Sequence, residues 1–111
     1  MIRVRLTRAE DETPTRLEVT GHAGRGAYGE DIVCAAVSAL IETLTLGLTH
    51  VSVQPPRGTV DPGEADIAFL QPMSPETRAI VETMVMGLKD LARSEPDAVR
   101  FDTVRSANEK L

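Results

Sequence analysis

One long, almost uncharged run constrains the fold of this chain most. Between residues 32 and 49 the only charged residue is Glu42, and Glu30 and Asp31 stand directly before the run. Acidic residues at an N-cap and in a first turn stabilise a helix, so the sequence predicts a helix over this run. Its first half is apolar on every side, which predicts a central helix that is buried all round. Glu42 and several Thr and Ser residues favour such a buried helix over a membrane span.

Alternating patterns predict strands on both sides of this helix. Residues 2–7 and 16–20 each alternate apolar and polar side chains, and the acidic stretch with Pro14 between them predicts a hairpin. After the helix, residues 50–53 and 65–70 are interpreted as two short strands. The second of them follows an Asp61-Pro62-Gly63 turn.

A second helix begins at Ser74, where serine can cap the helix and Pro75 suits its first position. The helix ends before Pro96, and residues 99–104 predict a last strand. The element order is therefore ββαββα with a final β-strand. Strands that are neighbours in sequence tend to pair, so we expect an α+β fold. It would be a two-layer sandwich of a mostly antiparallel or mixed sheet and two helices, as a single domain over residues 1–111.

The composition narrows the class of protein. The chain has 12 Lys and Arg against 17 Asp and Glu, a net charge of -5 and a pI near 5.0. This balance argues against a nucleic-acid backbone as the main partner and favours a basic one. Cys34 is the only cysteine, so no intramolecular disulfide can form, and the N-terminus lacks the apolar region of a signal peptide. We therefore expect a cytoplasmic protein.

Cys34 is the strongest candidate for chemistry. With Asp31 as the N-cap it would be the third helical residue, where free backbone N–H groups and the helix dipole stabilise a thiolate and an oxyanion. His50 lies sixteen residues further on, which is about 24 Å along a continuous helix and too far for a base. His22 follows the second predicted strand and can come close, because the chain returns to the helix start. The two residues predict a Cys–His dyad.

Two further residues can support such a dyad. Ser38 follows Cys34 by one helical turn and shares its helix face, while Asp31 could cap the helix or orient His22. The residues alone also leave plainer interpretations open. A lone cysteine in an apolar helix is most often a small buried hydrophobe, and His22 could be a turn residue. One Cys and one His are too few for a structural zinc site, so no metal is expected.

The segment before the first helix is rich in glycine. It reads Gly24-Arg25-Gly26-Ala27-Tyr28-Gly29 and matches G-x-G-x-x-G between a predicted strand and a predicted helix. We reject a dinucleotide site, because Glu30 and Asp31 would repel a pyrophosphate at the helix start and the preceding strand alternates. A flap is the better interpretation, in which glycines from Gly21 onward let Arg25 and Tyr28 close over a peptide. A plain connecting loop explains the segment nearly as well.

Two elements at a fixed spacing resemble the signature of a protease family. The chain contains Gly21-His22-Ala23 and then Gly29-Glu30-Asp31-Ile32-Val33-Cys34-Ala35-Ala36-Val37-Ser38, which look like the ribosomal-processing cysteine protease family Prp. The resemblance implies a catalytic dyad of His22 and Cys34. It also implies family motif positions at Gly21, Gly29, Asp31 and Ser38 and a mobile loop over residues 24–28.

The resemblance further implies an activity and its partners. The expected protein is a cytoplasmic bacterial homodimer that removes a short N-terminal extension from large-subunit ribosomal protein twenty-seven. Cleavage would follow an aromatic residue in a hydrophobic motif. No cofactor, metal, nucleic acid or membrane is part of this expectation.

Two other functions fit the residues. A non-enzymatic ribosome-assembly module could hold a basic protein tail on its acidic surface, and its binding would survive Cys34→Ala. A thiol redox sensor is the second, although the chain offers no resolving cysteine. On the second helix, the apolar patch is interpreted as core, with a dimer contact as an alternative at the neighbouring Gly87. The patch consists of Met84, Val85, Met86 and Leu88.

Overall fold

The fold combines a five-stranded sheet with two helices. The computed structural model describes residues 1–21, 28–61 and 63–106, and in the first helix it describes side chains from Ile32 onward. The elements in chain order are β1 (Ile2–Arg8), β2 (Pro14–Thr20), α1 (Tyr28–His50), β3 (Arg57–Asp61), β4 (Glu64–Ala68), α2 (Pro75–Ser94) and β5 (Val99–Arg105). This order confirms the predicted α+β class and the ββαββα sequence with a final strand.

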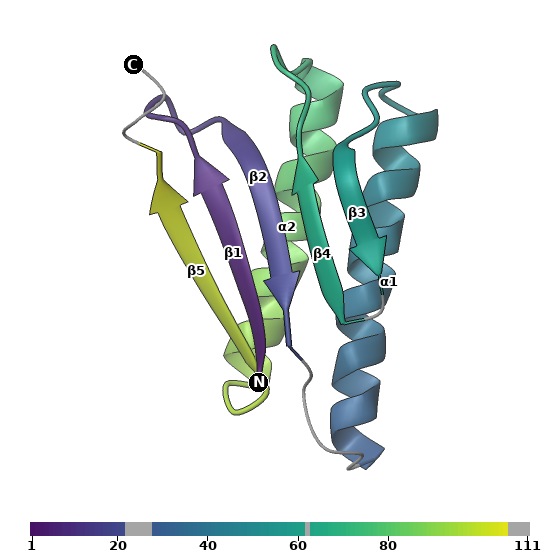
Figure 1. Cartoon of the computed structure of the whole chain (residues 1–111), viewed down its shortest axis with the longest axis vertical. Helices are drawn as coiled ribbons and strands as arrows, with labels where there is room; N and C mark the ends of the chain where they lie inside the picture. Colours follow the sequence, from purple (N-terminus) through teal and green to yellow (C-terminus); the bar gives the residue numbers. More distant parts are fainter. Residues whose placement is uncertain (22–27, 62, 107–111) are drawn as a thin grey trace.

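The sheet is mixed and has the strand order β3-β4-β2-β1-β5. β5 runs parallel to β1, whereas the β1–β2, β2–β4 and β3–β4 pairs are antiparallel. Both helices lie on one face of the sheet, with α1 toward the β3 side (Figure 1). The result is the expected two-layer sandwich, and the second face of the sheet carries none of the described helices.

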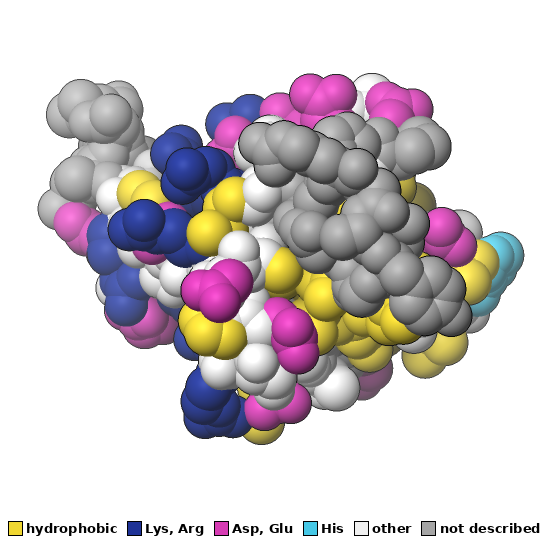
Figure 2. Space-filling view, turned by 90° about the horizontal axis from the view of Figure 1, so that it is seen from below, with side chains coloured by type: hydrophobic (Ala, Val, Ile, Leu, Met, Phe, Trp, Pro, Cys, Tyr) yellow, Lys and Arg dark blue, Asp and Glu magenta, His cyan; other side chains and the backbone are white. Residues whose placement is uncertain are grey.

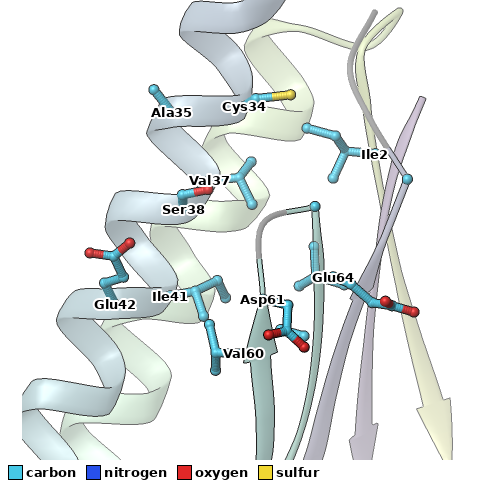
Figure 3. A pocket seen from close by; sticks show the side chains of 14 residues that line it. Ile2, Cys34, Ala35, Val37, Ser38, Ile41, Glu42, Val60, Asp61 and Glu64 are labelled. Atoms are coloured by element: carbon cyan, nitrogen blue, oxygen red, sulfur yellow. The ribbon is translucent and has the colours of Figure 1, made fainter.

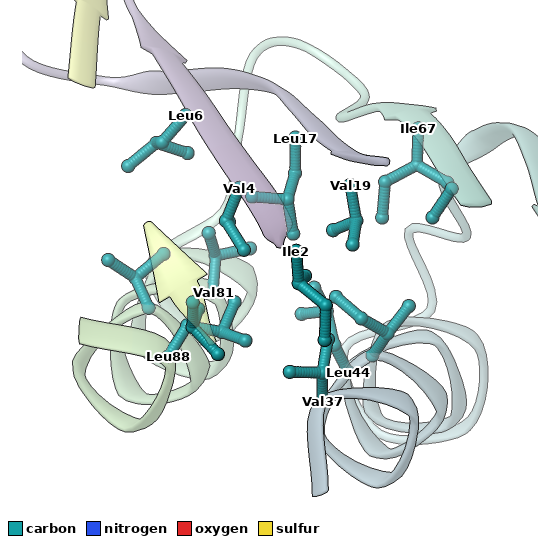
Figure 4. Packing of buried hydrophobic residues seen from close by; sticks show 14 of the residues in the cluster. Ile2, Val4, Leu6, Leu17, Val19, Val37, Leu44, Ile67, Val81 and Leu88 are labelled. Atoms are coloured by element: carbon teal, nitrogen blue, oxygen red, sulfur yellow. The ribbon is translucent and has the colours of Figure 1, made fainter. Parts of the chain in front are cut away.

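The core fills the space between the two layers. In β1 the alternate residues Ile2, Val4 and Leu6 are buried, as the sequence pattern predicts. They meet buried side chains from both helices, among them Leu44 of α1 and Leu88 of α2 (Figure 4). Each such side chain contributes about 1.5–3 kcal/mol through burial, so this interface carries most of the stabilisation of the fold.

The two helices approach each other at glycines. A Cβ added to Gly87 of α2 would lie 3.3 Å from Leu40 Cδ2, and one added to Gly47 of α1 would lie 3.2 Å from Ile80 Cγ2. Gly87 therefore sits at the contact between α1 and α2. Beside it, Val85 and Leu88 are buried core residues as interpreted, Met84 is partly buried against the core, and Met86 is 71% exposed.

The prediction that α1 is buried all round is wrong. Ile32 and Leu46 are 56% and 58% exposed, because the helix lies in the outer layer and packs only one face on the sheet. Within the described residues, one helical segment, Ile32–His50 of α1, has a length and hydropathy that would also suit a membrane span. Its buried side chains instead belong to the core shared with the sheet: Val33, Val37, Ile41, Leu44 and Leu48.

The ends of α1 also differ from the prediction. The helix begins at Tyr28, before the acidic pair, and it continues through His50, where a strand was expected. Residues 51–53 then form a turn in which the Val51 N–H donates to the Gly47 carbonyl at 2.9 Å. The third strand lies at 57–61, because those residues pair with β4 across the predicted turn.

The ends of α2 agree with the sequence signals. The Thr77 N–H donates to Ser74 Oγ at 3.1 Å, so Ser74 is the N-cap and Pro75 opens the helix. At the other end Glu95 is the C-cap and directly precedes Pro96. The cap and the proline positions were enough to predict this helix because they act locally.

Candidate active site

Cys34 lies in the second turn of α1 with a half-buried side chain that packs against the core. Because the helix begins at Tyr28, Cys34 is its seventh residue and not its third. The prediction of Asp31 as the N-cap is therefore wrong. The N–H groups without an intrahelical partner lie in the first turn of the helix, one turn before the thiol, since only the first four N–H groups of a helix lack such a partner.

A cavity of about 350 Å³ opens beside Cys34, between α1 and one end of the sheet. Figure 3 shows Cys34 and Val37 of α1 on one side and Ile2 of β1 on the other. We call this space the Cys34 cavity. Its lining residues are Ile2, Val19, Gly21, Cys34, Ala35, Val37, Ser38, Ile41, Glu42, Val60, Asp61, Gly63, Glu64 and Ala65.

Ser38 shares the cavity wall with Cys34, as the four-residue spacing predicts. Its side chain is exposed and lies one helical turn further along α1 (Figure 3). Glu42 follows after another turn and lines the same space. The Cys34 thiol and the Ser38 hydroxyl point toward the sheet across the cavity, whereas the Glu42 carboxylate points away from it (Figure 3).

Gly21 places the end of β2 at the same cavity. Its φ of +91° lies in the left-handed region, and a Cβ there would overlap the backbone carbonyl of Met1. Only glycine fits both constraints, so this residue fixes where the chain leaves the sheet. The next residue, His22, lies outside the described part of the chain, as do Gly24, Arg25 and Gly26.

The remaining predicted site residues lie in the first turn of α1. Tyr28 and Gly29, expected in the loop, are already helical, and Asp31 is helical as well. Of these residues the structure describes the backbone only. The other histidine, His50, ends the same continuous helix that holds Cys34, so it lies at the far end of α1 as expected.

The cavity combines apolar walls with carboxylates. Glu42, Asp61 and Glu64 line it together with the aliphatic side chains. Figure 2 shows the molecule from below. Hydrophobic side chains (yellow) gather near the centre of this view with carboxylates (magenta) beside them, and basic side chains (dark blue) lie mainly on its left. The site therefore suits an apolar ligand group with a neighbouring positive charge. Among the described residues no group of three or more His, Cys, Asp or Glu side chains could hold a metal ion.

The contribution of β3 to the cavity was not predicted from the sequence. Val60 and Asp61 line the cavity, and both belong to a strand that was not predicted. A usable signal was present, because Thr59 and Val60 favour a strand and stand directly before the Asp-Pro-Gly turn.

Comparison with known proteins places the chain among proteases. A family model described as cysteine protease Prp matches residues 1–100. The ribosomal processing cysteine protease Prp of Bacillus subtilis (strain 168) is 28% identical over 109 residues, which cover 93% of this chain and 97% of that protein.

Solved structures agree over nearly the full length. SMU.848 from Streptococcus mutans superposes with a TM-score of 0.83 at 28% identity and covers 96% of both chains. The ribosomal processing protease Prp from S. aureus, solved with a covalently linked product peptide, gives 0.84 at 27% identity over 93% of this chain and 99% of that one. With the family model matching residues 1–100, this chain belongs to the Prp family of cysteine proteases.

Proposed function

We propose that this protein removes the N-terminal extension of large-subunit ribosomal protein twenty-seven, with Cys34 as nucleophile and His22 as general acid and base. The observation that carries the proposal is the shared cavity wall of Cys34 and Gly21. His22 follows Gly21 directly in the sequence. Adjacent α-carbons lie about 3.8 Å apart, so covalent geometry keeps the histidine next to a residue of that wall.

The chemistry proceeds in two steps. The Cys34 thiolate attacks the carbonyl carbon of the scissile bond, and the imidazolium of His22 protonates the leaving amine as the C–N bond breaks. Water then attacks the thioester while His22 takes its proton, and the C–S bond breaks to release the carboxylate product. A half-buried position suits Cys34, because the thiolate must be accessible to the peptide yet screened from bulk water.

The other motif residues have supporting roles in this proposal. Ser38, one turn along the same cavity wall, is placed to hydrogen-bond the peptide or the dyad. Asp31 would orient His22, because its position in the first turn of α1 rules out the capping role. Residues 24–27, between Gly21 and the first turn of α1 that holds Tyr28 and Gly29, would form the loop that closes over the substrate.

The cavity walls fit the proposed substrate. Aliphatic side chains such as Val37, Ile41 and Val60 suit the hydrophobic motif before the cleaved bond. The carboxylates Glu42 and Asp61 suit a basic ribosomal protein. The same carboxylates are the observation that favours the second candidate function, a module that holds a basic tail without cleaving it.

We further propose that the protein acts in the cytoplasm as a homodimer. Three large apolar side chains on the helical layer support a partner surface: Ile32 and Leu46 of α1 and Met86 of α2 are each more than half exposed. Sedimentation should give twice the chain mass of 12.0 kDa. Met86→Lys should shift the distribution toward the monomer if this surface forms the contact, and an unshifted dimer would place the contact elsewhere.

The decisive experiment follows the mass of a substrate peptide. A peptide spanning the extension and the mature start of the organism's own ribosomal protein is incubated with the wild type and with Cys34→Ala in reducing buffer. Single-site cleavage by the wild type alone is the expected result. The two histidines offer a matched pair, because His22→Ala should abolish cleavage whereas His50→Ala, at the far end of α1, should leave it unchanged.

The outcomes separate the candidate functions. Cleavage by the Cys34→Ala variant would reject Cys34 as the nucleophile. Binding of the peptide by both proteins without cleavage would favour the module for a basic tail. Equal activity of His22→Ala and His50→Ala would reject the dyad while leaving the protease assignment in place.

A further inference from the structure

The outer edge of β3 is open beside the catalytic cavity. β3 is the last strand on its side of the sheet, and all five of its residues are exposed. Within the described ranges no strand pairs with its outer edge. Such an edge presents backbone N–H and C=O groups that can pair with another extended chain. Its central residues, Gly58, Thr59 and Val60, carry no charge that would oppose this pairing.

The register identifies which backbone groups face outward. Asp61 pairs with Glu64, and two residues separate them, so this pair closes a two-residue hairpin. The closing pair of such a hairpin exchanges hydrogen bonds, and hydrogen-bonded and non-hydrogen-bonded pairs then alternate along the ladder. Val60 falls in a non-hydrogen-bonded pair with Ala65, so its N–H and C=O point away from β4. Thr59, by contrast, pairs inward with Asp66.

The Val60 side chain connects this edge to the Cys34 cavity. It lies opposite Ala65, which is 4% exposed on the helix-covered face, and it lines the cavity together with Cys34. Figure 3 shows it close to Ile41 of α1. One residue thus offers its backbone to the open edge and its side chain to the cavity wall.

The size of the cavity fits a site in which the strand edge holds the peptide backbone. Its volume of about 350 Å³ lies at the lower end of the range of small-molecule pockets, roughly 300–1,000 Å³. It has room for one or two side chains of a peptide and leaves the peptide backbone to be held elsewhere. An extended chain on a sheet edge turns every second side chain to the same face, which here is the face with the cavity.

We propose that the substrate peptide binds as an additional strand on β3, hydrogen-bonded to the N–H and C=O of Val60, with alternate side chains directed into the Cys34 cavity. This inference rests on the proposed protease function and specifies how the same site holds its substrate. The opposite edge, β5, does not contribute to the lining of the Cys34 cavity, so the proposal concerns β3 alone.

An N-methyl scan of the substrate peptide tests the pairing. Single N-methyl groups are placed on successive residues on both sides of the cleaved bond, and kcat/KM is measured with the wild-type protein. On one side of the bond, methylation of every second residue should lower kcat/KM at least roughly tenfold, because it removes a hydrogen bond and blocks the edge. The intervening positions are matched controls and should change it less than roughly threefold.

Amide hydrogen exchange gives a second readout that does not depend on turnover. When unmodified peptide saturates Cys34→Ala, exchange of the Val60 amide should slow at least roughly tenfold. The Thr59 amide should be protected with and without peptide, and the amides of β5 should not change. A Val60 amide that stays as fast with bound peptide as without it would overturn the proposal.

The two proposals fail in different ways. Cleavage of the unmodified peptide with a uniform tolerance of N-methyl groups would reject strand addition and keep the protease. A peptide that is neither cleaved by the wild type nor bound by Cys34→Ala would reject both.

Discussion

At the end of the sheet where β1 begins, a cavity of about 350 Å³ separates Cys34 from the β3–β4 hairpin. At the other end, a bidentate ion pair joins β1 to α2: Arg8 donates to both carboxylate oxygens of Glu82 at 2.8 and 2.9 Å. Arg105 of β5 binds Glu12 of the β1–β2 turn in the same way, at 2.8 and 2.9 Å. One end is open, whereas ion pairs tie the elements together at the other, which we call the cross-linked end.

This difference predicts that the open end of the sheet determines activity and the cross-linked end determines stability. The cross-linked end ties β1, β5 and α2 together, while the open end leaves room that a peptide can fill. Substitutions at the open end should therefore act mainly on catalysis, and those at the cross-linked end mainly on the free energy of unfolding. Substitutions at the two ends test this expectation.

Cys34→Ala should lower kcat/KM for the ribosomal peptide at least roughly a thousandfold, because no other group can form the thioester. The free energy of unfolding should change by less than about 1 kcal/mol, since the side chain is only half-buried. Peptide cleavage and urea denaturation measure the two effects on the same preparation. A loss of stability comparable to the loss of activity would show that the open end also supports the fold.

Gly21→Ala should be an exception to this rule. Gly21 lines the cavity at the open end, yet its replacement should lower stability, because the backbone conformation there requires glycine. The left-handed φ and the overlap with the Met1 carbonyl should together cost about 2–4 kcal/mol of unfolding free energy. Gly87→Ala is the matched control: its Cβ would meet only the flexible Leu40 side chain at 3.3 Å. That variant should stay within about 1 kcal/mol of the wild type. Equal midpoints in urea for both variants would contradict this account.

The fold could be predicted wherever the signal was local. The β1 alternation, the Ser74 cap and the Asp-Pro-Gly turn each depend on neighbouring residues, and each was predicted correctly. The partner of a strand is not a local property, so residues 50–53 were mistaken for a strand although they have none. β3 was missed even though Thr59 and Val60 offered a local signal for it. The helix start was misplaced because Glu30 and Asp31 suit a first turn as well as a cap.

The residues of the candidate site also fall into those that local spacing predicts and those that it does not. Cys34 and Ser38 could be placed on one helix face from their spacing alone, and the cavity confirms it. Val60 and Asp61 reach the cavity only through sheet topology, which no short pattern in the sequence encodes. The apolar run from residue 32 was assigned to a buried helix because hydrophobicity does not distinguish a core helix from an outer one with an uncovered apolar face.

Glu82→Gln tests the cross-linked end. Removing one charge from the pair with Arg8, whose side chain is 11% exposed, should cost about 1–2 kcal/mol of unfolding free energy at neutral pH. Peptide cleavage should be unchanged, because Glu82 does not line the Cys34 cavity. Asp90→Asn, in an exposed pair with Arg93, is the control and should change stability by less than about 0.5 kcal/mol.

The same ion pair should give the stability a pH dependence. The hydrogen bond from Arg8 lowers the pKa of Glu82 below its ordinary value. The stabilisation is therefore fully present above the pKa of the unfolded carboxyl, near 4.3, and is lost as the pH falls through the lower folded value. The difference in unfolding free energy between the wild type and Glu82→Gln, measured by urea titration, should begin to narrow below about pH 4. A gap that stays constant down to pH 3 would show that the pair does not act through its charge.

Thr77→Val should give the smallest effect and the opposite sign. Thr77 lies in the first turn of α2 and is fully buried, and its hydroxyl has no hydrogen-bond partner among the described residues. Valine has nearly the same shape and removes this unpaired group, so the free energy of unfolding should rise by about 0.5–1 kcal/mol. The cap is kept, because Ser74 binds the backbone N–H of residue 77. Thr83→Val, whose exposed hydroxyl donates to the Ala79 carbonyl at 2.6 Å, should stay within about 0.5 kcal/mol of the wild type. A loss of stability in Thr77→Val would mean that a buried partner holds the hydroxyl, and the cross-linked end would then be more completely paired than its ion pairs alone indicate.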